Sequence, residues 1–379
     1  ANMAVSVHPE FEYSYIKVSD DEGKQEILLM ATGLIDSLFE EDQYEIIKTV
    51  TGESLDGLEY LHPLREEVPL QAEFSHRIIL GDHVTLEDGT GCVHTAPGHG
   101  PEDYEVGVKN GIEVFCPVGE NGCYTEEAGK YADCGVKDAN PEITHDLYHN
   151  GALLKEGTID HRVGLCWRCK TPLVYYSKPS LYIKTTAKQK EIIEENKKIN
   201  WYPDYVGEKR FGNWLENMND WAISRNRYWG TPIPLWRCEC GEDIMIGSRK
   251  ELVEKAIEDI DETIELHRPY VDDVHIKCPH CGKEMSRVKD VMDCWFDSGS
   301  MPFAQYHYPF ENKELFEEQF PADFISEGID QTRGWFYVLL VISTIISGES
   351  SFKNVVVNDM MLDAHGKKMS KSTGNIIDP

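Results

Sequence analysis

Four cysteines in two close pairs form the strongest metal-ligand pattern in the sequence. The first pair is Cys238 and Cys240. The second is Cys278 and Cys281, within the turn Cys-Pro-His-Cys-Gly-Lys. Four thiolates are enough for a closed tetrahedral site, the usual geometry of structural zinc. The spacing therefore predicts one structural zinc ion, and the simpler alternative is a set of unrelated buried cysteines.

Cysteine usage also bears on the cellular compartment. The chain has 11 cysteines, and an odd number in a chain of this length speaks against a disulfide scaffold. Pairs together with scattered single cysteines are typical of metal-binding turns in a reducing compartment, so we expect a cytoplasmic protein. A third pair, Cys166 and Cys169, offers only half of a ligand set, and its occupancy stays open.

A basic loop near the C-terminus is suited to binding a polyphosphate. Lys368 and Lys371 lie within the run Lys-Lys-Met-Ser-Lys-Ser-Thr-Gly-Asn. Two ammonium groups on a flexible, glycine-bearing loop can close over phosphates and offset the charge that develops as pyrophosphate leaves. The alternative is a solvated basic loop without function.

An acidic cluster is expected at the end of a buried strand. Glu327, Asp330 and Gln331 lie between a strand-like run and the apolar run 335–346, and a second strand-like run follows at 355–358. This order predicts a β-α-β unit and a parallel sheet, whose carboxyl edge is where open α/β sheets bind ligands. The acids could bind an α-ammonium or ribose hydroxyls, and a plain acidic helix cap is the alternative.

Two further stretches have residues suited to binding. Residues 89–104 are rich in glycine and contain His94, His99 and Asp103, so the backbone can approach a ligand closely there. A glycine-proline turn with exposed histidines is the alternative.

Residues 221–234 interleave Arg225 and Arg227 with aromatic side chains. A basic, stacking surface suits single-stranded RNA. The alternative is a strand and turn that are packed by Trp221 and Trp229.

The elements that would position these groups differ along the chain. Strand-like runs at 13–18, 44–50 and 76–80 predict an α+β or β-barrel-like module in the first 155 residues, with a short strand and helix within 27–41.

Two helices are expected beyond that module. A charged helix is expected at 187–198. A capping box at Ser248 and Glu251 opens a second, amphipathic helix with its apolar positions at Leu252, Val253, Ala256, Ile257, Ile260 and Ile264.

The composition limits the classes of function. The chain has 67 Asp and Glu residues against 37 Lys and Arg residues, which gives a formal net charge of −30. Such an acidic surface argues against nonspecific binding of nucleic acids or acidic membranes, although a local basic patch can still hold a nucleic acid. No run is long and apolar enough to span a bilayer. The length of 379 residues suggests two or three domains.

The lysine loop, Lys-Met-Ser-Lys-Ser followed by Gly-Asn, resembles the signature loop of class I aminoacyl-tRNA synthetases. Residues 324–336 resemble the isoleucyl branch of that family. The resemblance implies that ATP, with Mg²⁺, is bound by Lys368, Met369, Ser370, Lys371 and Ser372, of which the two lysines are catalytic. It also implies that the aminoacyl-adenylate is held by Glu327, Gly328, Asp330 and Gln331. Trp295, in a stretch that resembles another part of the same site, would wall an apolar side-chain pocket.

The glycine-rich stretch resembles the editing domain of isoleucyl-, valyl- and leucyl-tRNA synthetases, in its isoleucyl version. The resemblance implies an editing site at His94, Thr95, His99 and Asp103. Asp103 would bind the α-ammonium of the misattached amino acid, and His94 would lie beside the scissile ester or the terminal ribose. Such a site is needed because a pocket that fits isoleucine excludes valine only weakly, which is the established example of this limit.

Together these stretches follow the order of the family and cover nearly all of the chain. The resemblance implies an internal fragment of an α/β, multidomain enzyme of archaeal or eukaryote-like kind. We expect a partial editing domain (1–155), a connection with the Cys166/Cys169 half-site (156–200), a connective region with the zinc knuckle (201–321) and the second half of a Rossmann-like catalytic fold (322–379). In the family such a pair completes a zinc site with another pair upstream of the editing domain. The sequence has no such pair, so we expect no metal or only partial occupancy at Cys166/Cys169.

The resemblance also implies the activity of the complete enzyme. It would join isoleucine to tRNA(Ile) with ATP and edit valyl-tRNA(Ile), as a monomer. The sequence lacks a His-x-Gly-His stretch from the first half of the nucleotide fold. We therefore expect the fragment alone to be inactive in aminoacylation.

Three other interpretations remain open. A valyl-tRNA synthetase is the nearest, and a misacylation assay on the complete enzyme would separate it from the isoleucyl type. A zinc-knuckle RNA-binding module without catalysis would not need the lysine loop. A free-standing editing hydrolase would leave residues 327–336 and 368–375 unexplained.

Overall fold

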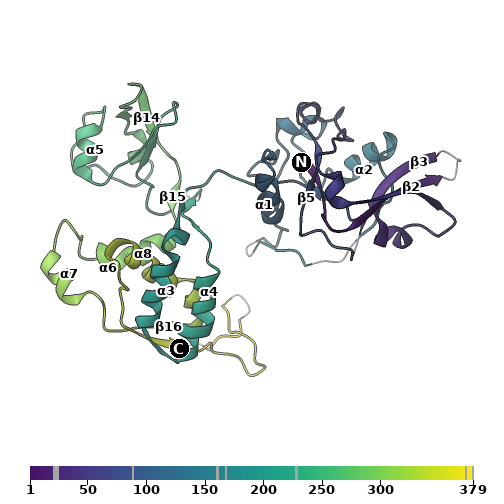
Figure 1. Cartoon of the computed structure of the whole chain (residues 1–379). Helices are drawn as coiled ribbons and strands as arrows, with labels where there is room; N and C mark the ends of the chain where they lie inside the picture. The colour runs from purple at the N-terminus through teal and green to yellow at the C-terminus, as the bar shows by residue number, and fades with distance from the viewer. Residues whose placement is uncertain are drawn as a thin grey trace. The chain divides into compact units, whose positions relative to one another are not determined.

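The computed structural model describes residues 1–19, 25–87, 89–158, 162–166, 169–226, 229–371 and 374–377. The chain forms two compact units, Ala1–Lys178 and Pro179–Pro379, which appear in Figure 1 from purple to teal and from teal to yellow. Within the described ranges, no helix has the length and apolar character needed to cross a membrane. The finer division into four regions, 1–155, 156–200, 201–321 and 322–379, stays a prediction.

The first unit is built on two three-stranded sheets. One sheet has the order β5-β1-β6, in which β1 runs parallel to β5 and antiparallel to β6. The other is antiparallel, with the order β3-β2-β4. The strands are β1 Ala4–Val7, β2 Glu12–Ser19, β3 Gln25–Ala31, β4 Tyr44–Thr51, β5 Arg77–Leu80 and β6 Val93–Thr95. The expected strands at 13–18, 44–50 and 76–80 are therefore confirmed, and the pairings among described residues leave both sheets open.

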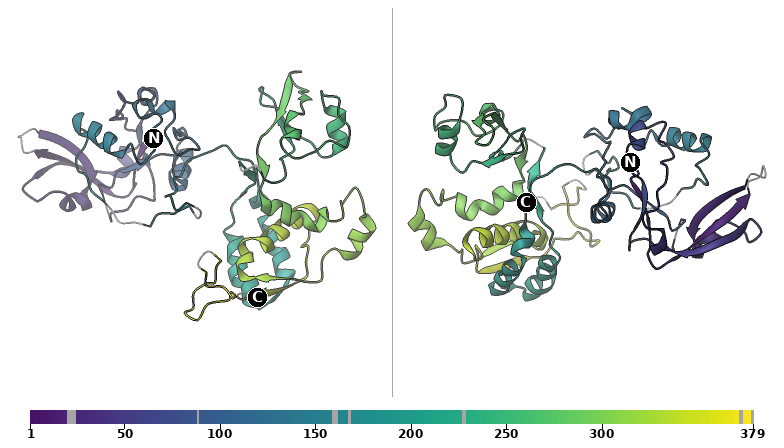
Figure 2. Two further views of the ribbon diagram at one scale, coloured as in Figure 1. Left: turned by 180° about the vertical axis from the view of Figure 1, so that it is seen from behind. Right: turned by 45° about the horizontal axis from the view of Figure 1, so that its top comes forward.

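A shared core joins the two sheets. Tyr13 and Ile16 of β2 and Met30 of β3 are buried together with Val7 of β1 and Ile78 of β5. The segment expected to hold a strand and a helix forms β3 and then a 3₁₀ turn, Thr32–Ser37. Two helices complete the unit, α1 Pro101–Lys109 and α2 Asn140–His149. The β2-β3-β4 ribbon extends to the end of the unit away from α1 (Figure 2).

The second unit contains a parallel sheet with the order β16-β17-β8. Its strands are β8 Asn200–Tyr202, β16 Ile325–Gly328 and β17 Asn354–Asn358, and the helices that pack with it include α3 Gln189–Lys198, α4 Gly212–Glu216 and α8 Trp335–Ser347. This arrangement confirms the expected β-α-β unit and the charged helix. Ile192 of α3, Leu340 of α8, Trp201 and Val355 form the centre of the core.

Helix α6, Cys294–Ala304, packs closely on α8. A Cβ atom on Gly299 would lie 2.8 Å from Ile342 Cδ1 and 2.9 Å from Val338 Cβ. Only a glycine fits that contact without moving α8, so Gly299 fixes the distance between the two helices. Phe303 of α6 and Phe316 of α7, Lys313–Gln319, share a smaller core with Ile342.

A four-stranded sheet with the order β12-β11-β14-β13 lies within the second unit. Its strands are β11 Leu235–Arg237, β12 Asp243–Met245, β13 Ile276–Lys277 and β14 Glu284–Arg287. The unit also has two short two-stranded sheets, in which β7 Tyr182–Ile183 pairs with β9 Trp221–Ala222 and β10 Ser224–Arg225 pairs with β15 Val291–Met292. Sheet and loops enclose a core that contains Trp236, Ile246, Val271 and Met285.

The helix of this region is shorter than the sequence predicts. Ser248 caps α5, Arg249–Lys255, by accepting a hydrogen bond from the Glu251 N–H at 3.1 Å, as expected. The helix then ends, because Ala256 is extended and bridges to Ile276. The expected helical positions Ile257, Ile260 and Ile264 therefore lie beyond it, although Ile260 and Ile264 still pack on the same core.

Candidate functional site

The four paired cysteines meet at one place in the second unit. Their sulfur atoms all lie within 4.8 Å of one another. Cys238 Sγ is 3.4 Å from Cys281 Sγ, and Cys240 Sγ is 3.8 Å from Cys278 Sγ. Tetrahedral zinc with Zn–S bonds of about 2.3 Å separates its sulfur ligands by about 3.8 Å. The thiolates therefore fit a single zinc ion.

Tight turns shape both halves of this cysteine cluster. In the first turn, Gly241 N–H donates to Cys238 O and has a φ of 90°. In the second, Gly282 N–H donates to Cys278 O and has a φ of 74°. A positive φ strains residues with a side chain, so glycine is favoured at both positions. Cys238 and Cys278 are buried and Cys240 and Cys281 are exposed, so the cluster lies at the surface of the sheet.

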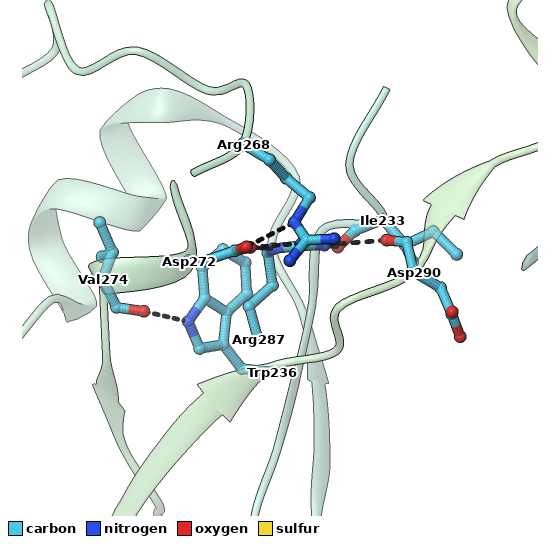
Figure 3. Close-up of polar contacts among 7 residues, drawn as sticks. All are labelled: Ile233, Trp236, Arg268, Asp272, Val274, Arg287 and Asp290. Atoms are coloured by element: carbon cyan, nitrogen blue, oxygen red, sulfur yellow. Dashed lines mark hydrogen bonds and ion pairs between the residues drawn. The ribbon is translucent and has the colours of Figure 1, made fainter. Parts of the chain in front are cut away.

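The buried side chain of Arg287 connects the two ends of the segment that contains the cysteine cluster (Figure 3). The Arg287 side chain is fully buried and donates from Nε to Asp272 Oδ1 at 2.8 Å. Its Nη1 donates to Ile233 O and to Asp290 O, both at 3.0 Å. Ile233 precedes the four-stranded sheet and Asp290 follows it, so one guanidinium ties the entering chain to the leaving chain. Arg268 Nε also donates to Asp272, at 2.5 Å.

The third cysteine pair has the same turn without the other ligands. Cys166 N–H donates to Thr171 O at 2.8 Å, and Lys170 N–H donates to Cys166 O at 2.9 Å. Cys169 Sγ lies 3.1 Å from Thr171 Oγ1. In the part of the chain that the structure describes, no third Cys, His or carboxylate joins this pair. The half-site predicted from the sequence therefore stays a half-site here.

The acidic cluster lies where the sequence places it, at the carboxyl end of β16. Glu327 and Gly328 end the strand, and Asp330 and Gln331 lie in the following 3₁₀ turn, Ile329–Arg333. Gln331 Nε2 donates to Asp330 Oδ2 at 3.2 Å, and Gln331 Oε1 accepts from Trp335 N–H at 3.0 Å. Gln331 thus caps α8 and orients the neighbouring carboxylate.

Trp295 meets this cluster from helix α6. A Cβ atom on Gly334 would lie 2.9 Å from Trp295 Cη2 and 2.7 Å from Gln331 Oε1. The absence of a side chain at Gly334 lets the indole approach the turn. The structure therefore brings Trp295 and Gln331 together, as expected for one site, and Trp295 keeps 39% of its surface exposed.

The lysine loop follows β17 and is drawn in yellow in Figure 2. Lys368 and Lys371 are exposed, and Met369 and Ser370 are half-buried. Lys368 bridges back to Leu362, which makes the first part of the loop a narrow turn. Ser372, which the sequence also assigns to this site, lies outside the described residues.

In the first unit, His94, His99 and Asp103 are close enough to act on one another. Desolvation lowers the pKa of both histidines, and the Asp103 carboxylate partly offsets this by raising it. Asp103 lies in the first turn of α1, and its Oδ2 accepts from Ala96 N–H at 2.8 Å. His99 Nδ1 lies 3.0 Å from Tyr175 O.

Thr95 faces the other way. It is fully buried, and its Oγ1 lies 2.6 Å from Ser6 Oγ. His94 and Thr95 are successive residues of β6, and successive side chains of a strand point to opposite faces. Thr95 therefore belongs to the interior of the sheet, while His94 lies on the opposite face, where its Nδ1 contacts Asn2.

Arg225 forms an ion pair with Asp293 of the same unit. Its Nη2 contacts Asp293 Oδ2 at 2.5 Å, and Trp221 Nε1 donates to the same oxygen at 3.2 Å. Asp293 in turn caps α6. Trp221 packs against two cores of the unit, whereas Trp229 is 97% exposed, so the packing alternative is confirmed for Trp221 and wrong for Trp229. Arg227 lies outside the described residues, and RNA contacts of this stretch stay a prediction.

Sequence reasoning missed two residues that contact the histidine site. Asn2 Nδ2 lies 3.0 Å from His94 Nδ1, and the Tyr60 hydroxyl donates to Asn2 Oδ1. Neither residue belongs to a recognisable motif. The available signal was that Asn2 lies two residues before β1, which pairs with the strand of His94.

Comparison with known proteins defines the class. A family model described as tRNA synthetases class I (I, L, M and V) matches residues 5–379. The chain belongs to this family.

The curated relatives that match the chain indicate one branch of this family. One named isoleucine–tRNA ligase, from Methanothermobacter thermautotrophicus, is 51% identical over 380 residues, and another of that name, from Clostridium tetani, is 48% identical over 379 residues. Both alignments cover 100% of this chain and 36% of the relative. The expected resemblance to the isoleucyl branch is thereby confirmed, and the chain spans about a third of the length of these relatives.

A solved structure of an Agrobacterium radiobacter K84 LeuRS with tRNA and LeuAMS also aligns. The alignment covers 98% of this chain and 42% of the LeuRS chain, with 18% sequence identity and a TM-score of 0.34. That likeness is too low to bear on the fold.

Proposed function

We propose that the chain is part of an isoleucyl-tRNA synthetase, in which the second unit serves isoleucine activation and the first unit serves editing. The observation that carries this proposal is the meeting of Trp295 with the Asp330–Gln331 turn at the carboxyl end of β16. An apolar wall beside carboxylates suits an amino acid whose side chain is aliphatic and whose ammonium needs a negative partner.

In isoleucine activation, side chains of the second unit would bind the aminoacyl-adenylate and ATP and orient them for the reaction. Glu327 and Asp330 would hold the ammonium or the ribose hydroxyls of the adenylate, with Gln331 as a further hydrogen-bond partner. Lys368 and Lys371 would contact the phosphates of ATP, which binds with Mg²⁺, and offset the charge on the leaving pyrophosphate. Isoleucine would then pass to tRNA(Ile).

In editing, Asp103 would bind the α-ammonium of valine on misacylated tRNA(Ile). Ala96 N–H holds one of its carboxylate oxygens, which fixes the direction of the other. His94 would lie beside the ester or the terminal ribose. Zinc would bind to Cys238, Cys240, Cys278 and Cys281 in a purely structural role, because four thiolates leave no open position.

The 379-residue chain alone is not expected to activate isoleucine. ATP would have to be held from both halves of the nucleotide fold, and losing half of a cooperating site removes the geometry along with the contacts. Exchange activity of the isolated chain above a heat-killed control would contradict this expectation.

The proposed specificity is tested on the full-length parent protein. Pyrophosphate exchange should be strongest with isoleucine, weaker with valine and absent with leucine and methionine. A preference for valine would favour the valyl alternative. No exchange with any amino acid would overturn the proposal.

A further inference from the structure

Asn2 bridges two side chains of the first unit, and its orientation is determined by its partners. Its Nδ2 donates to Ala4 O at 2.8 Å and lies 3.0 Å from His94 Nδ1. Its Oδ1 accepts from the Tyr60 hydroxyl. Because a carbonyl oxygen can only accept, the contact with Ala4 O identifies the NH₂ end of the amide. The roles of the other two partners follow from that assignment.

The bridge determines which nitrogen of His94 carries the proton. The NH₂ group of Asn2 can only donate, so His94 Nδ1 accepts and the single proton of the neutral ring is on Nε2. The neutral ring is favoured by the Asn2 NH₂ group, because an imidazolium would carry a hydrogen at Nδ1 as well, and desolvation also lowers the pKa of His94. His94 then has one hydrogen to offer, at Nε2.

Tyr60 is itself firmly placed. Desolvation raises the pKa of its phenol to about 12, so the hydroxyl keeps its proton and remains a donor to Asn2. Its ring lies 5.5 Å from the ring of His76, centroid to centroid. His76 is buried, and its Nε2 donates to Gln71 O at 2.9 Å. The Tyr60 N–H also donates to His76 O at 3.0 Å.

We propose that Tyr60, acting through Asn2, is a positioning residue that holds His94 as the Nε2–H tautomer. His94 then serves the editing reaction as a neutral hydrogen-bond donor to an oxygen of the aminoacyl ester or the terminal ribose. It is not the base that activates water, since its only lone pair is taken by Asn2. This inference rests on the proposed editing function and adds the residue that prepares the site.

The tautomer can be measured directly on the 379-residue chain. Histidine labelled with ¹⁵N distinguishes the two ring nitrogens by NMR, and His94→Gln assigns the signal. We expect the Nε2–H form of His94 in the wild type and a mixture of both tautomers in Tyr60→Phe, which keeps the ring and removes only the hydroxyl. Tyr124→Phe is the matched control, since this half-buried tyrosine of the same unit is not part of the bridge. An Nδ1–H form in the wild type, or an unchanged tautomer in Tyr60→Phe, overturns the inference.

A kinetic test uses the full-length enzyme and valyl-tRNA(Ile). Tyr60→Phe should lower kcat for deacylation about two- to tenfold, the effect of one ordinary hydrogen bond, with KM and isoleucine-dependent exchange unchanged. Unchanged kcat in Tyr60→Phe, with active wild-type enzyme, overturns this inference alone. Absence of deacylation by the wild type overturns the proposed editing function and the role of the bridge with it.

Discussion

The Asp363 carboxylate accepts a hydrogen bond from the Asn375 amide across the base of the lysine loop, with 2.8 Å between Oδ2 and Nδ2. Asp363 Oδ1 also accepts from Lys367 N–H at 2.9 Å, and Asn375 Oδ1 accepts from Ser370 N–H at 2.9 Å. The bond from Asn375 and then that from Lys367 N–H lower the pKa of Asp363. One pair of side chains therefore sets the shape of the loop that presents Lys368 and Lys371.

Loss of the hydrogen bond between Asp363 and Asn375 should slow the activation of isoleucine with ATP. We expect Asn375→Ala in the full-length enzyme to reduce isoleucine-dependent pyrophosphate exchange about two- to tenfold, because the two lysines lose their common support. Asn217→Ala is the control, since the amide of this exposed residue bonds only locally, to Asn213 O. Equal exchange rates for the two variants would show that the loop keeps its shape without Asn375.

Metal analysis tests the cysteine assignment. The purified chain should contain one zinc, and Cys278→Ser should lose it, because three thiolates and a hydroxyl make a much poorer ligand set. Cys169→Ser should keep the zinc, since Cys166 and Cys169 supply only a half-site. Two zinc ions per chain, or retention of the metal by Cys278→Ser, would refute the assignment.

The buried arginine should be important for the stability of the zinc-binding region. Arg287→Met would leave the Ile233 and Asp290 carbonyls without this donor, and each buried acceptor left unpaired costs about 1–3 kcal/mol, whereas Asp272 keeps Arg268 as its partner. Arg237→Met is the matched control, because the exposed pair of Arg237 and Asp243 contributes about 0–1 kcal/mol. Urea unfolding, monitored by the release of zinc, measures the loss of stability in both variants. Equal losses in the two variants would contradict the role of Arg287.

Acid should destabilise the first unit through Asp146. Lys130 Nζ, which lies 2.7 Å from Asp146 Oδ2, and then the Tyr131 hydroxyl lower the pKa of Asp146 from 3.8 to about 2. A carboxylate with a lowered pKa stabilises the folded state above its unfolded pKa, and this stabilisation is lost as the pH falls through the folded pKa. Wild type should therefore exceed Asp146→Asn in thermal stability at pH 6, and the difference should shrink towards pH 2. A difference independent of pH would exclude this linkage.

The local patterns in the sequence were sufficient for the elements with strong periodicity. The β-α-β unit and the cysteine cluster were predicted correctly because the apolar run 335–346 and the Cys spacing have few structural solutions. Helix α5 was predicted too long, because a tertiary bridge between Ala256 and Ile276 replaces the next helical turn. Such a competition is decided by residues distant in sequence.

The candidate editing site shows the same limit. His94 and Asp103 could be proposed from one stretch of sequence, whereas Asn2 and Tyr60 reach His94 only through the fold. Thr95 was assigned to the site through the resemblance of residues 89–104 to an editing domain. The strand Val93–Thr95 turns alternate side chains to opposite faces, which removes Thr95 from the face of His94.

The division of labour between the two units is the central claim, and one paired measurement tests it. In the full-length enzyme, Asp103→Ala should abolish deacylation of valyl-tRNA(Ile) and leave isoleucine-dependent pyrophosphate exchange intact. Asp103 would bind the misattached amino acid, and its bond from Ala96 N–H lies within the first unit. Lys371→Ala should do the reverse, because its ammonium acts only on the phosphates of ATP. Loss of both activities in either variant, or loss of exchange in Asp103→Ala, would contradict the account.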